Sequence, residues 1–206
     1  MTMTLHASLG SGGGFADPVQ SSQSVFRGVM DALARPGSVH TIAEPVHTPS
    51  PMMSGTAAIA LALFDHDTPI WMDDRFSAEL EIDAWLRFHT GAPLTRDASY
   101  ASFALIHGGV TLPDFETFAL GTPEYPDRST TLVVQVDSLT EGPELVLNGP
   151  GIRGSATLRA GALPSGFPGR MRANRALFPR GVDLLLVCGS ELVAMPRSTI
   201  VAVKEV

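Results

Sequence analysis

Residues 182–188 and 191–195 read VDLLLVC and ELVAM, two apolar runs separated only by Gly189 and Ser190. Short runs that are rich in leucine and valine and bounded by turn residues predict buried β-strands. One helix, at about residues 169–178, is expected before them, ended by Pro179 and Gly181. Further strand-like runs begin after Arg128, separated by glycine and proline: TTLVVQVDSL (130–139), PELVLNG (143–149), SATLRA (155–160) and STIVAV (198–203).

The first half of the chain predicts helices instead. Residues 15–37 read FADPVQSSQSVFRGVMDALARPG, in which Asp17 suits the N-cap and Pro18 the first helical position. Arg35, Pro36 and Gly37 end this helix. The apolar residues that fall on one face of it, and are expected to face the core, are Val25, Phe26, Val29, Met30 and Leu33.

Two more helices are expected in this half. One begins with Ser50 as its cap and runs to residue 64, and the other covers residues 77–89 with Ser77 as its cap. Strands are expected at 39–42, 69–72 and 103–106, and a short helix ended by Gly121 follows residue 113. Helices in front and strands behind predict an α/β domain. The inward residues of the 77–89 helix are expected to be Leu80, Ala84, Trp85 and Phe88.

The domain organisation is expected to be simple. Residues 1–14 end in three consecutive glycines and are expected to be a disordered tail, and residues 15–206 a single domain. No basic segment followed by an apolar stretch opens the chain, and Cys188 is the only cysteine. Both features favour a cytoplasmic protein without disulfides.

Composition excludes some partners and favours others. The longest apolar run, residues 57–64, is far shorter than the roughly 20 residues of a membrane-spanning helix. The net charge is −7 without a basic stripe, which argues against a nucleic-acid partner. Only 17% of the residues are charged and the mean hydropathy is +0.17. So sparse a charge predicts that part of the surface is buried against another chain.

Residues 149–154 read GPGIRG and match the glycine pattern of dinucleotide-binding loops. That pattern requires a following helix whose amides face the pyrophosphate, whereas SATLRAG predicts a strand. A tight turn between two strands therefore explains the motif best. The exposed amides near Gly149 and Gly151, with Arg153 beside them, leave an anion site as the alternative.

Other polar groups give weaker indications. Asp65, His66 and Asp67 are adjacent in the sequence and point in different directions, so turn formation explains them better than a metal site, and no metal is predicted. His107 follows a predicted strand and could act as an acid or a base in a cleft. The sequence contains no G-x-S-x-G motif and no H-E-x-x-H motif.

The arginines leave three interpretations open. Thirteen of the fourteen basic residues are arginine, and Arg27 and Arg35 share one face of the first helix. Guanidinium groups can bind phosphate or phosphonate in bidentate fashion, can bind acidic protein surfaces, or can simply be solvated. The remaining candidates are the cluster of Arg170, Arg172, Arg175 and Arg180, and Arg197 near the end of the chain.

Six blocks of this sequence, in order, resemble PhnH, a family of proteins that belong to the phosphonate carbon–phosphorus lyase complex. The resemblance extends from about Phe15 to Thr199, and none of the blocks is a catalytic fingerprint. The blocks are VFRGVMDALARPG (25–37), IALALFDHDTPIW (59–71), WLRFHTGAP (85–93), LVLNGPGI (145–152), RALFPRGVDLLLV (175–187) and MPRST (195–199).

The resemblance implies a mixed sheet flanked by helices, similar to the large domain of pyridoxal-phosphate-dependent transferases, in a homodimer. No pyridoxal phosphate or other cofactor is expected. The single lysine, Lys204, agrees with this, because a Schiff base would need an interior lysine.

The resemblance also implies a core complex with subunits G, I and J. With G, I and the ATPase-like subunit L, such a subunit is needed to transfer an alkylphosphonate to C1′ of the ribose of ATP, displacing adenine. The resemblance supplies no catalytic residue, so we expect this chain to have an accessory role in assembly. The alternative is a subunit that binds phosphonate or nucleoside triphosphate, for which the candidate residues are Arg35, Gly149, Gly151, Arg153 and Arg197.

Overall fold

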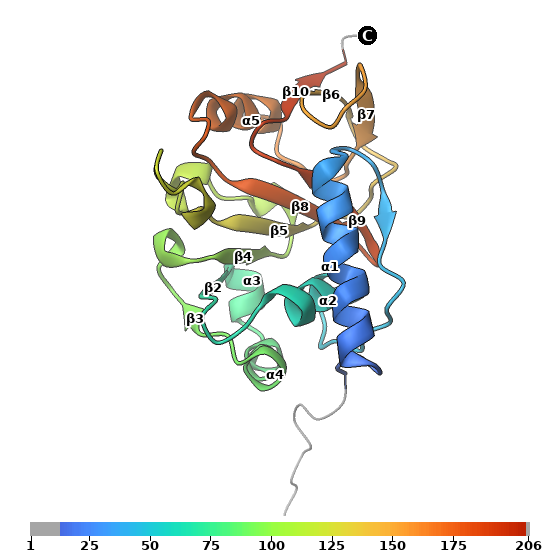
Figure 1. Ribbon diagram of the computed structural model, residues 1–206, viewed down its shortest axis with the longest axis vertical. Helices are drawn as coiled ribbons and strands as arrows, with labels where there is room; N and C mark the ends of the chain where they lie inside the picture. The colour runs from blue at the N-terminus through green and yellow to red at the C-terminus, as the bar shows by residue number, and fades with distance from the viewer. Residues whose placement is uncertain (1–12, 205–206) are drawn as a thin grey trace, which may run out of the picture.

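The computed structural model describes residues 13–204, so most of the predicted tail lies outside the described residues (Figure 1). Its centre is a seven-stranded mixed sheet in the order β1-β9-β8-β5-β4-β2-β3. Strands β3, β2, β4, β5 and β8 are parallel to one another, and at one edge β9 pairs antiparallel with β8 and β1 pairs antiparallel with β9. The strands are β1 (His40–Thr41), β2 (Ile70–Met72), β3 (Leu94–Thr95), β4 (Phe103–Ile106), β5 (Thr131–Gln135), β8 (Asp183–Cys188) and β9 (Glu191–Met195).

Both faces of this sheet are buried, which is why its central strands are apolar without interruption. Along β5, Val133 faces one apolar cluster while Leu132 and Val134 face the other. The same alternation continues on β8, where Leu185 and Leu186 point to opposite faces and are fully buried. The predicted α/β class is thus confirmed, with the mixed sheet as its core.

Four helices pack on the first face of the sheet: α1 (Pro18–Ala34), α2 (Ser54–Leu63), α3 (Asp74–Ser77) and α4 (Leu80–Thr90). The predicted cap of α1 is confirmed, because the Asp17 carboxylate accepts from the Gln20 N–H at 3.1 Å. Helix α1 lies in front of the sheet in Figure 1. Its C-terminal end approaches the elements that cover the second face of the sheet.

The second face is covered by α5 (Phe167–Ala176) and by a small antiparallel sheet of order β10-β6-β7. Its strands are β6 (Glu144–Asn148), β7 (Ala156–Arg159) and β10 (Ile200–Val203). Short 3₁₀ turns complete this side: η1 (Ala98–Tyr100), η2 (Gly109–Thr111), η3 (Phe115–Thr117) and η4 (Pro126–Arg128).

Three predicted helix features are wrong. Helix α2 begins at Ser54 rather than at Ser50, because the buried Gln135 side chain accepts from the Met53 N–H at 2.7 Å and so takes the place of a local cap. Helix α4 begins at Leu80, and Ser77 instead ends α3. The short helix before Gly121 is only the 3₁₀ turn η3.

The inward faces of two helices also differ from the prediction. On α1, Val25 and Val29 are buried, but Phe26 and Met30 are each 49% exposed. On α4 the exposed fractions of Leu80 and Phe88 are 82% and 64%, while the buried residues of this helix are Ile82, Trp85 and Leu86. Among residues 13–204, no helix combines the length and the apolar character that crossing a membrane requires.

Candidate functional site

The glycine-rich segment 149–155 connects β6 to β7, which pair antiparallel. The motif is therefore a turn between two strands, as predicted, and no helix begins after it. Gly149, Gly151 and Gly154 have φ angles of 136°, 81° and 76°. L-amino acids with a side chain rarely adopt these angles, so the turn needs its glycines.

Two of these glycines also permit close contact with neighbouring backbone. A Cβ at Gly149 would lie 3.1 Å from the carbonyl oxygen of Ser198, and one at Gly151 would collide with the carbonyl oxygen of Ala34. The turn therefore packs between the C-terminal end of α1 and the loop that precedes β10. A helix C-terminus presents carbonyl oxygens and the negative end of its dipole, which disfavours an anion at Gly151.

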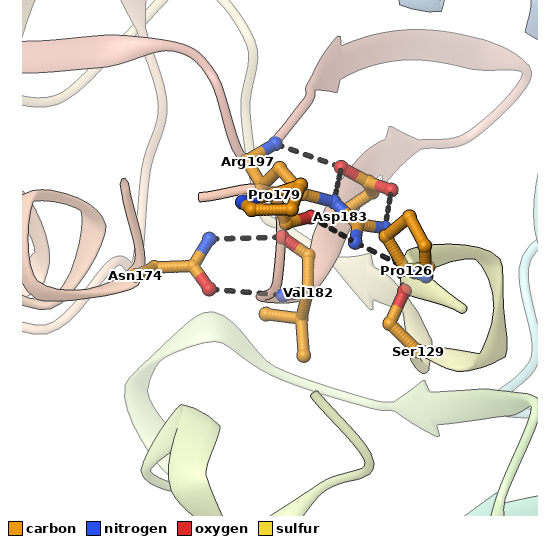
Figure 2. A network of polar contacts seen from close by, with 7 residues as sticks. All are labelled: Pro126, Ser129, Asn174, Pro179, Val182, Asp183 and Arg197. Atoms are coloured by element: carbon orange, nitrogen blue, oxygen red, sulfur yellow. Dashed lines mark hydrogen bonds and ion pairs between the residues drawn. The ribbon is translucent and has the colours of Figure 1, made fainter. Parts of the chain in front are cut away.

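Arg197 lies in that same loop, but its side chain is only 13% exposed and its guanidinium points toward Asp183, Ser129 and Pro126 (Figure 2). It donates to both carboxylate oxygens of Asp183, from Nε at 3.1 Å and from Nη2 at 2.5 Å. Nη2 also donates to Ser129 Oγ at 2.6 Å, and Nη1 donates to the carbonyl oxygens of Pro126 and Pro179 at 2.9 and 3.2 Å. With every donor engaged, a ligand could bind Arg197 only by displacing a partner inside the chain.

A second clamp lies beside Arg197 in Figure 2. The Asn174 side chain accepts from the Val182 N–H and donates to the Val182 carbonyl, both at 2.9 Å. Asn174 is 2% exposed and belongs to α5, so this pair fixes the helix against the beginning of β8. The two clamps together hold α5, β8 and the loop 196–199 in one arrangement.

The other candidate arginines lie on the surface near this loop. Arg35 forms an exposed ion pair with Asp31 at 3.1 Å, one turn earlier on α1. Arg153 is exposed in the turn 149–155, and Arg175 donates from Nε to the Ser198 carbonyl at 3.3 Å. The structure thus brings the backbone of all five predicted residues into one region, but it points Arg197 away from the surface.

Sequence reasoning missed the partner of Arg197, Asp183, and the closeness of Arg175 to the glycine turn. Asp183 is the second residue of the apolar run VDLLLVC, and a lone carboxylate at the start of a buried strand indicates that it has a polar or charged partner. No comparable signal joins Arg175 to Ser198, because their contact depends on how α5 packs against β10.

At the carboxyl ends of the parallel strands, Asp73 and His107 meet beyond β2 and β4. The order of the strands reverses here, and in α/β sheets such crevices commonly hold ligands. Both oxygens of the buried Asp73 carboxylate are already used, one by the Phe76 N–H at 3.0 Å and one by the His107 N–H at 2.8 Å. The His107 ring packs edge-on against Phe76, so this pair mainly fixes the chain after each strand.

The Asp65-His66-Asp67 segment forms a turn. Asp65 accepts from the Thr68 hydroxyl at 2.6 Å and from the Asp67 N–H at 2.9 Å, and these hydrogen bonds lower the pKa of its carboxyl. No group of three or more metal-ligating side chains occurs in the described part of the chain. Burial, followed by the nearby Glu191 and Asp137, raises the pKa of the Cys188 thiol, which keeps it protonated and poorly nucleophilic.

A cavity of about 740 Å³ opens at the opposite edge of the sheet, where β4 and β5 begin. Its charged lining is mixed, with Arg128 stacked on Tyr125 and with Asp67 and Asp127 nearby. These charges have no single sign, so the cavity indicates no particular ligand.

Comparison with known proteins identifies relatives over nearly the whole chain. The family described as bacterial phosphonate metabolism protein (PhnH) matches residues 13–202. The chain is 44% identical over 187 residues to the "Alpha-D-ribose 1-methylphosphonate 5-triphosphate synthase subunit PhnH" of Rhizobium meliloti (strain 1021), covering 91% of this chain and 93% of that one. It is 30% identical over 183 residues to the "Putative C-P lyase subunit protein HtxG" of Stutzerimonas stutzeri, covering 88% and 86%. The chain therefore belongs to the PhnH family of bacterial phosphonate metabolism proteins.

Proposed function

We propose that this chain is an accessory subunit of the carbon–phosphorus lyase core complex, required for the α-D-ribose 1-methylphosphonate 5-triphosphate synthase step of phosphonate breakdown. The observation that carries the proposal is the 44% identity to a subunit of that synthase across nine-tenths of both chains. An accessory role fits the polar groups described above, because Asp73, Asp183 and Arg197 are occupied by contacts within the chain.

The proposal includes a homodimer of single-domain chains, residues 15–206, in the cytoplasm, bound to subunits G, I and J and acting with the ATPase-like subunit L. The exposed apolar side chains of α1 and α4 support burial against other chains, because Phe26, Met30, Leu80 and Phe88 are all at least 49% exposed.

We also propose kinship of the mixed sheet to the large domain of pyridoxal-phosphate-dependent transferases, without the cofactor. The position of Lys204, the only lysine, supports the proposal that no pyridoxal phosphate is bound as a Schiff base. It lies just beyond β10, is 59% exposed and pairs with Glu144 at 2.7 Å.

The test is co-expression of this chain with subunits G, I and J, followed by size exclusion with light scattering. One large species that contains all four chains is the expected result. A chain that elutes separately at moderate salt would contradict the proposal. The chain expressed alone is the control, and its mass reports whether it forms the homodimer.

The alternative function is binding of a small anion, phosphonate or nucleoside triphosphate, at Arg35, Gly149, Gly151, Arg153 and Arg197. The observation that favours it is that Arg153, beside the glycine turn, forms no ion pair with any residue between 13 and 204. Calorimetry of the purified chain with ATP and with methylphosphonate tests it. Heat that is lost in Arg153→Ala would support the anion site, whereas no heat supports the assembly role.

A further inference from the structure

The positive charge of this acidic chain is concentrated in one segment. Residues 145–182 contain six arginines and no acidic residue, whereas all 21 acidic residues lie elsewhere with the other eight basic residues. The segment forms most of β6, all of β7 and all of α5. Figure 1 shows these elements gathered with β10 at one end of the molecule, opposite α4.

Only two of these six arginines are neutralised within the described chain. Arg159 pairs with Glu144 at 2.6 Å, and Arg170 pairs with Asp114 at 3.3 Å. The four that form no ion pair with residues 13–204 are Arg153, Arg172, Arg175 and Arg180.

Contacts around the loop 196–199 join these four arginines into one region. Arg172 and Arg175 are three residues apart on α5 and so share a flank of the helix, and Arg175 donates to the Ser198 carbonyl. A Cβ at Gly149 would lie close to the same Ser198 carbonyl. The turn that carries Arg153 is therefore next to Arg175. Arg180 follows Pro179, whose carbonyl is held by Arg197.

A large aromatic side chain lies within this region. Phe178 follows the C-terminal end of α5 and is 65% exposed, whereas Phe167 and Met171 within that helix are buried. An exposed aromatic ring among arginines that form no ion pair within the described chain is typical of protein–protein interface cores, where aromatic residues and arginine dominate the binding energy.

We propose that Arg153, Arg172, Arg175, Phe178 and Arg180 form a docking surface, the arginine surface, for a carboxylate-rich face of another polypeptide of the core complex. The inference rests on the proposed function. Charge complementarity selects the partner, because guanidinium groups pair with carboxylates in bidentate geometry and the segment 145–182 that carries these arginines contains no carboxylate. Phe178 would fill an apolar depression between those carboxylates.

The experiment uses the complex of G, I and J and two charge reversals of the full chain, Arg172→Glu and Arg153→Glu, alone and combined. Neither side chain makes an ion pair or side-chain hydrogen bond with residues 13–204, so both variants are expected to fold. The matched control is Arg96→Glu, which reverses an exposed arginine outside the surface that also has no ion-pair partner among those residues. Titration calorimetry of each variant with the complex of G, I and J is repeated at two salt concentrations.

The expected result is at least about tenfold weaker binding for each variant at low salt, a smaller difference at high salt, and no change for the control. Unchanged binding in the double variant would overturn the inference and leave the proposed function intact. If the unmodified chain fails to bind the other subunits, the proposed function fails, and the inference with it. A homodimer that dissociates in the variants, with no loss of subunit binding, would assign the surface to a second copy and overturn the inference.

Discussion

Arg197 shows how one side chain can organise several segments. Its guanidinium reaches Asp183 at the start of β8, Ser129 before β5, the carbonyl of Pro126 in η4 and the carbonyl of Pro179 after α5. The side chain is 13% exposed and that of Asp183 22%. Removing one member of such a pair leaves the other charge poorly solvated, and that penalty exceeds the value of the pair itself.

We therefore expect Arg197→Ala to lower the free energy of unfolding by about 3 kcal/mol. Arg197→Lys is expected to recover only part of this loss, because an ammonium group cannot reach four partners in the planar arrangement of a guanidinium. Urea denaturation followed by circular dichroism measures both. The control is Arg87→Ala, which removes an exposed ion pair with Asp83 and is expected to cost less than about 0.5 kcal/mol. Equal losses in Arg197→Ala and Arg87→Ala would contradict the structural role of Arg197.

At the scale of elements, the turn between β6 and β7 joins the two halves of the chain. Gly151 lies against the carbonyl group of Ala34, the last residue of α1, and Gly149 lies against the loop before β10. The small sheet is thereby fixed against the end of the first helix, although more than a hundred residues separate them in the sequence. Shape, rather than charge, makes these glycines necessary.

Gly151→Ala is expected to destabilise the chain by at least about 2 kcal/mol, because it adds a collision with Ala34 to an unfavourable φ of 81°. Gly154→Ala is the matched control. Its φ of 76° is nearly the same, but a Cβ there would meet no atom within 4 Å. It is therefore expected to cost about 1 kcal/mol, the price of the backbone conformation alone. Thermal denaturation of both variants tests this, and equal melting temperatures would rule out the close contact at Gly151.

The small sheet also carries a titratable pair. Glu144 accepts from Lys204 at 2.7 Å and from Arg159 at 2.6 Å, and the Lys204 hydrogen bond is the main reason that its pKa lies below the ordinary value of 4.5. A lowered pKa in the folded state means that the unfolded chain binds protons more readily. The contribution of Glu144 to stability is therefore complete above about pH 4.5 and is lost as the pH falls below it.

Glu144→Gln is accordingly expected to weaken the dependence of stability on pH between about pH 5 and 3, and to destabilise the chain more at the upper end of this range than at the lower end. Urea midpoints measured across this range provide the test. Glu141→Gln removes a nearby carboxylate that forms no ion pair within residues 13–204, and serves as the control. If both variants and the unmodified chain show the same pH dependence, the pair with Lys204 and Arg159 contributes nothing to stability.

Much of the element order could be predicted from the sequence, and its errors have identifiable causes. The strands β5 and β8 were predictable because burial on both faces demands uninterrupted Val and Leu. The start of α2 was not, because the group that holds it is Gln135, some 80 residues further on. The exposed side of α4 could not be predicted from the sequence either, because Leu80 and Phe88 are apolar and yet lie on the solvent side of the helix.

For the candidate site, the sequence selected residues that lie near one another in the fold, but it did not predict the directions of their side chains. Arg35, Arg153 and Arg197 do lie around the glycine turn, yet Arg197 is held inward by Asp183. The approach of Arg175 to this turn depends on the packing of α5 on β10, which no local pattern encodes. Local rules predict individual helices and strands well. They do not predict a surface that several elements form together, because that surface depends on how the elements pack.

At the scale of the whole molecule, the seven-stranded sheet lies between two apolar clusters, one under α1, α2 and α4 and the other under α5 and the small sheet. Its central strands β5 and β8 have residues of 0% exposure over Leu132–Val134 and Leu184–Val187. Its outer strands β1 and β3 contain only two residues each. Such a gradient of burial predicts that the centre opens only when the whole chain unfolds, whereas the edges open locally.

Native-state hydrogen exchange tests this gradient. The amides of residues 132–134 and 184–187 are expected to exchange with the free energy of global unfolding, measured independently by urea denaturation, because both clusters must separate to expose them. The amides of β1 and β3 are expected to exchange at least about tenfold faster, through openings that depend little on urea, since few apolar contacts are lost there. Equal protection across all seven strands would mean that the edges are bound as tightly as the centre. In the assembled complex, slower exchange confined to α5 and to residues 149–155 would instead mark the arginine surface as covered by a partner.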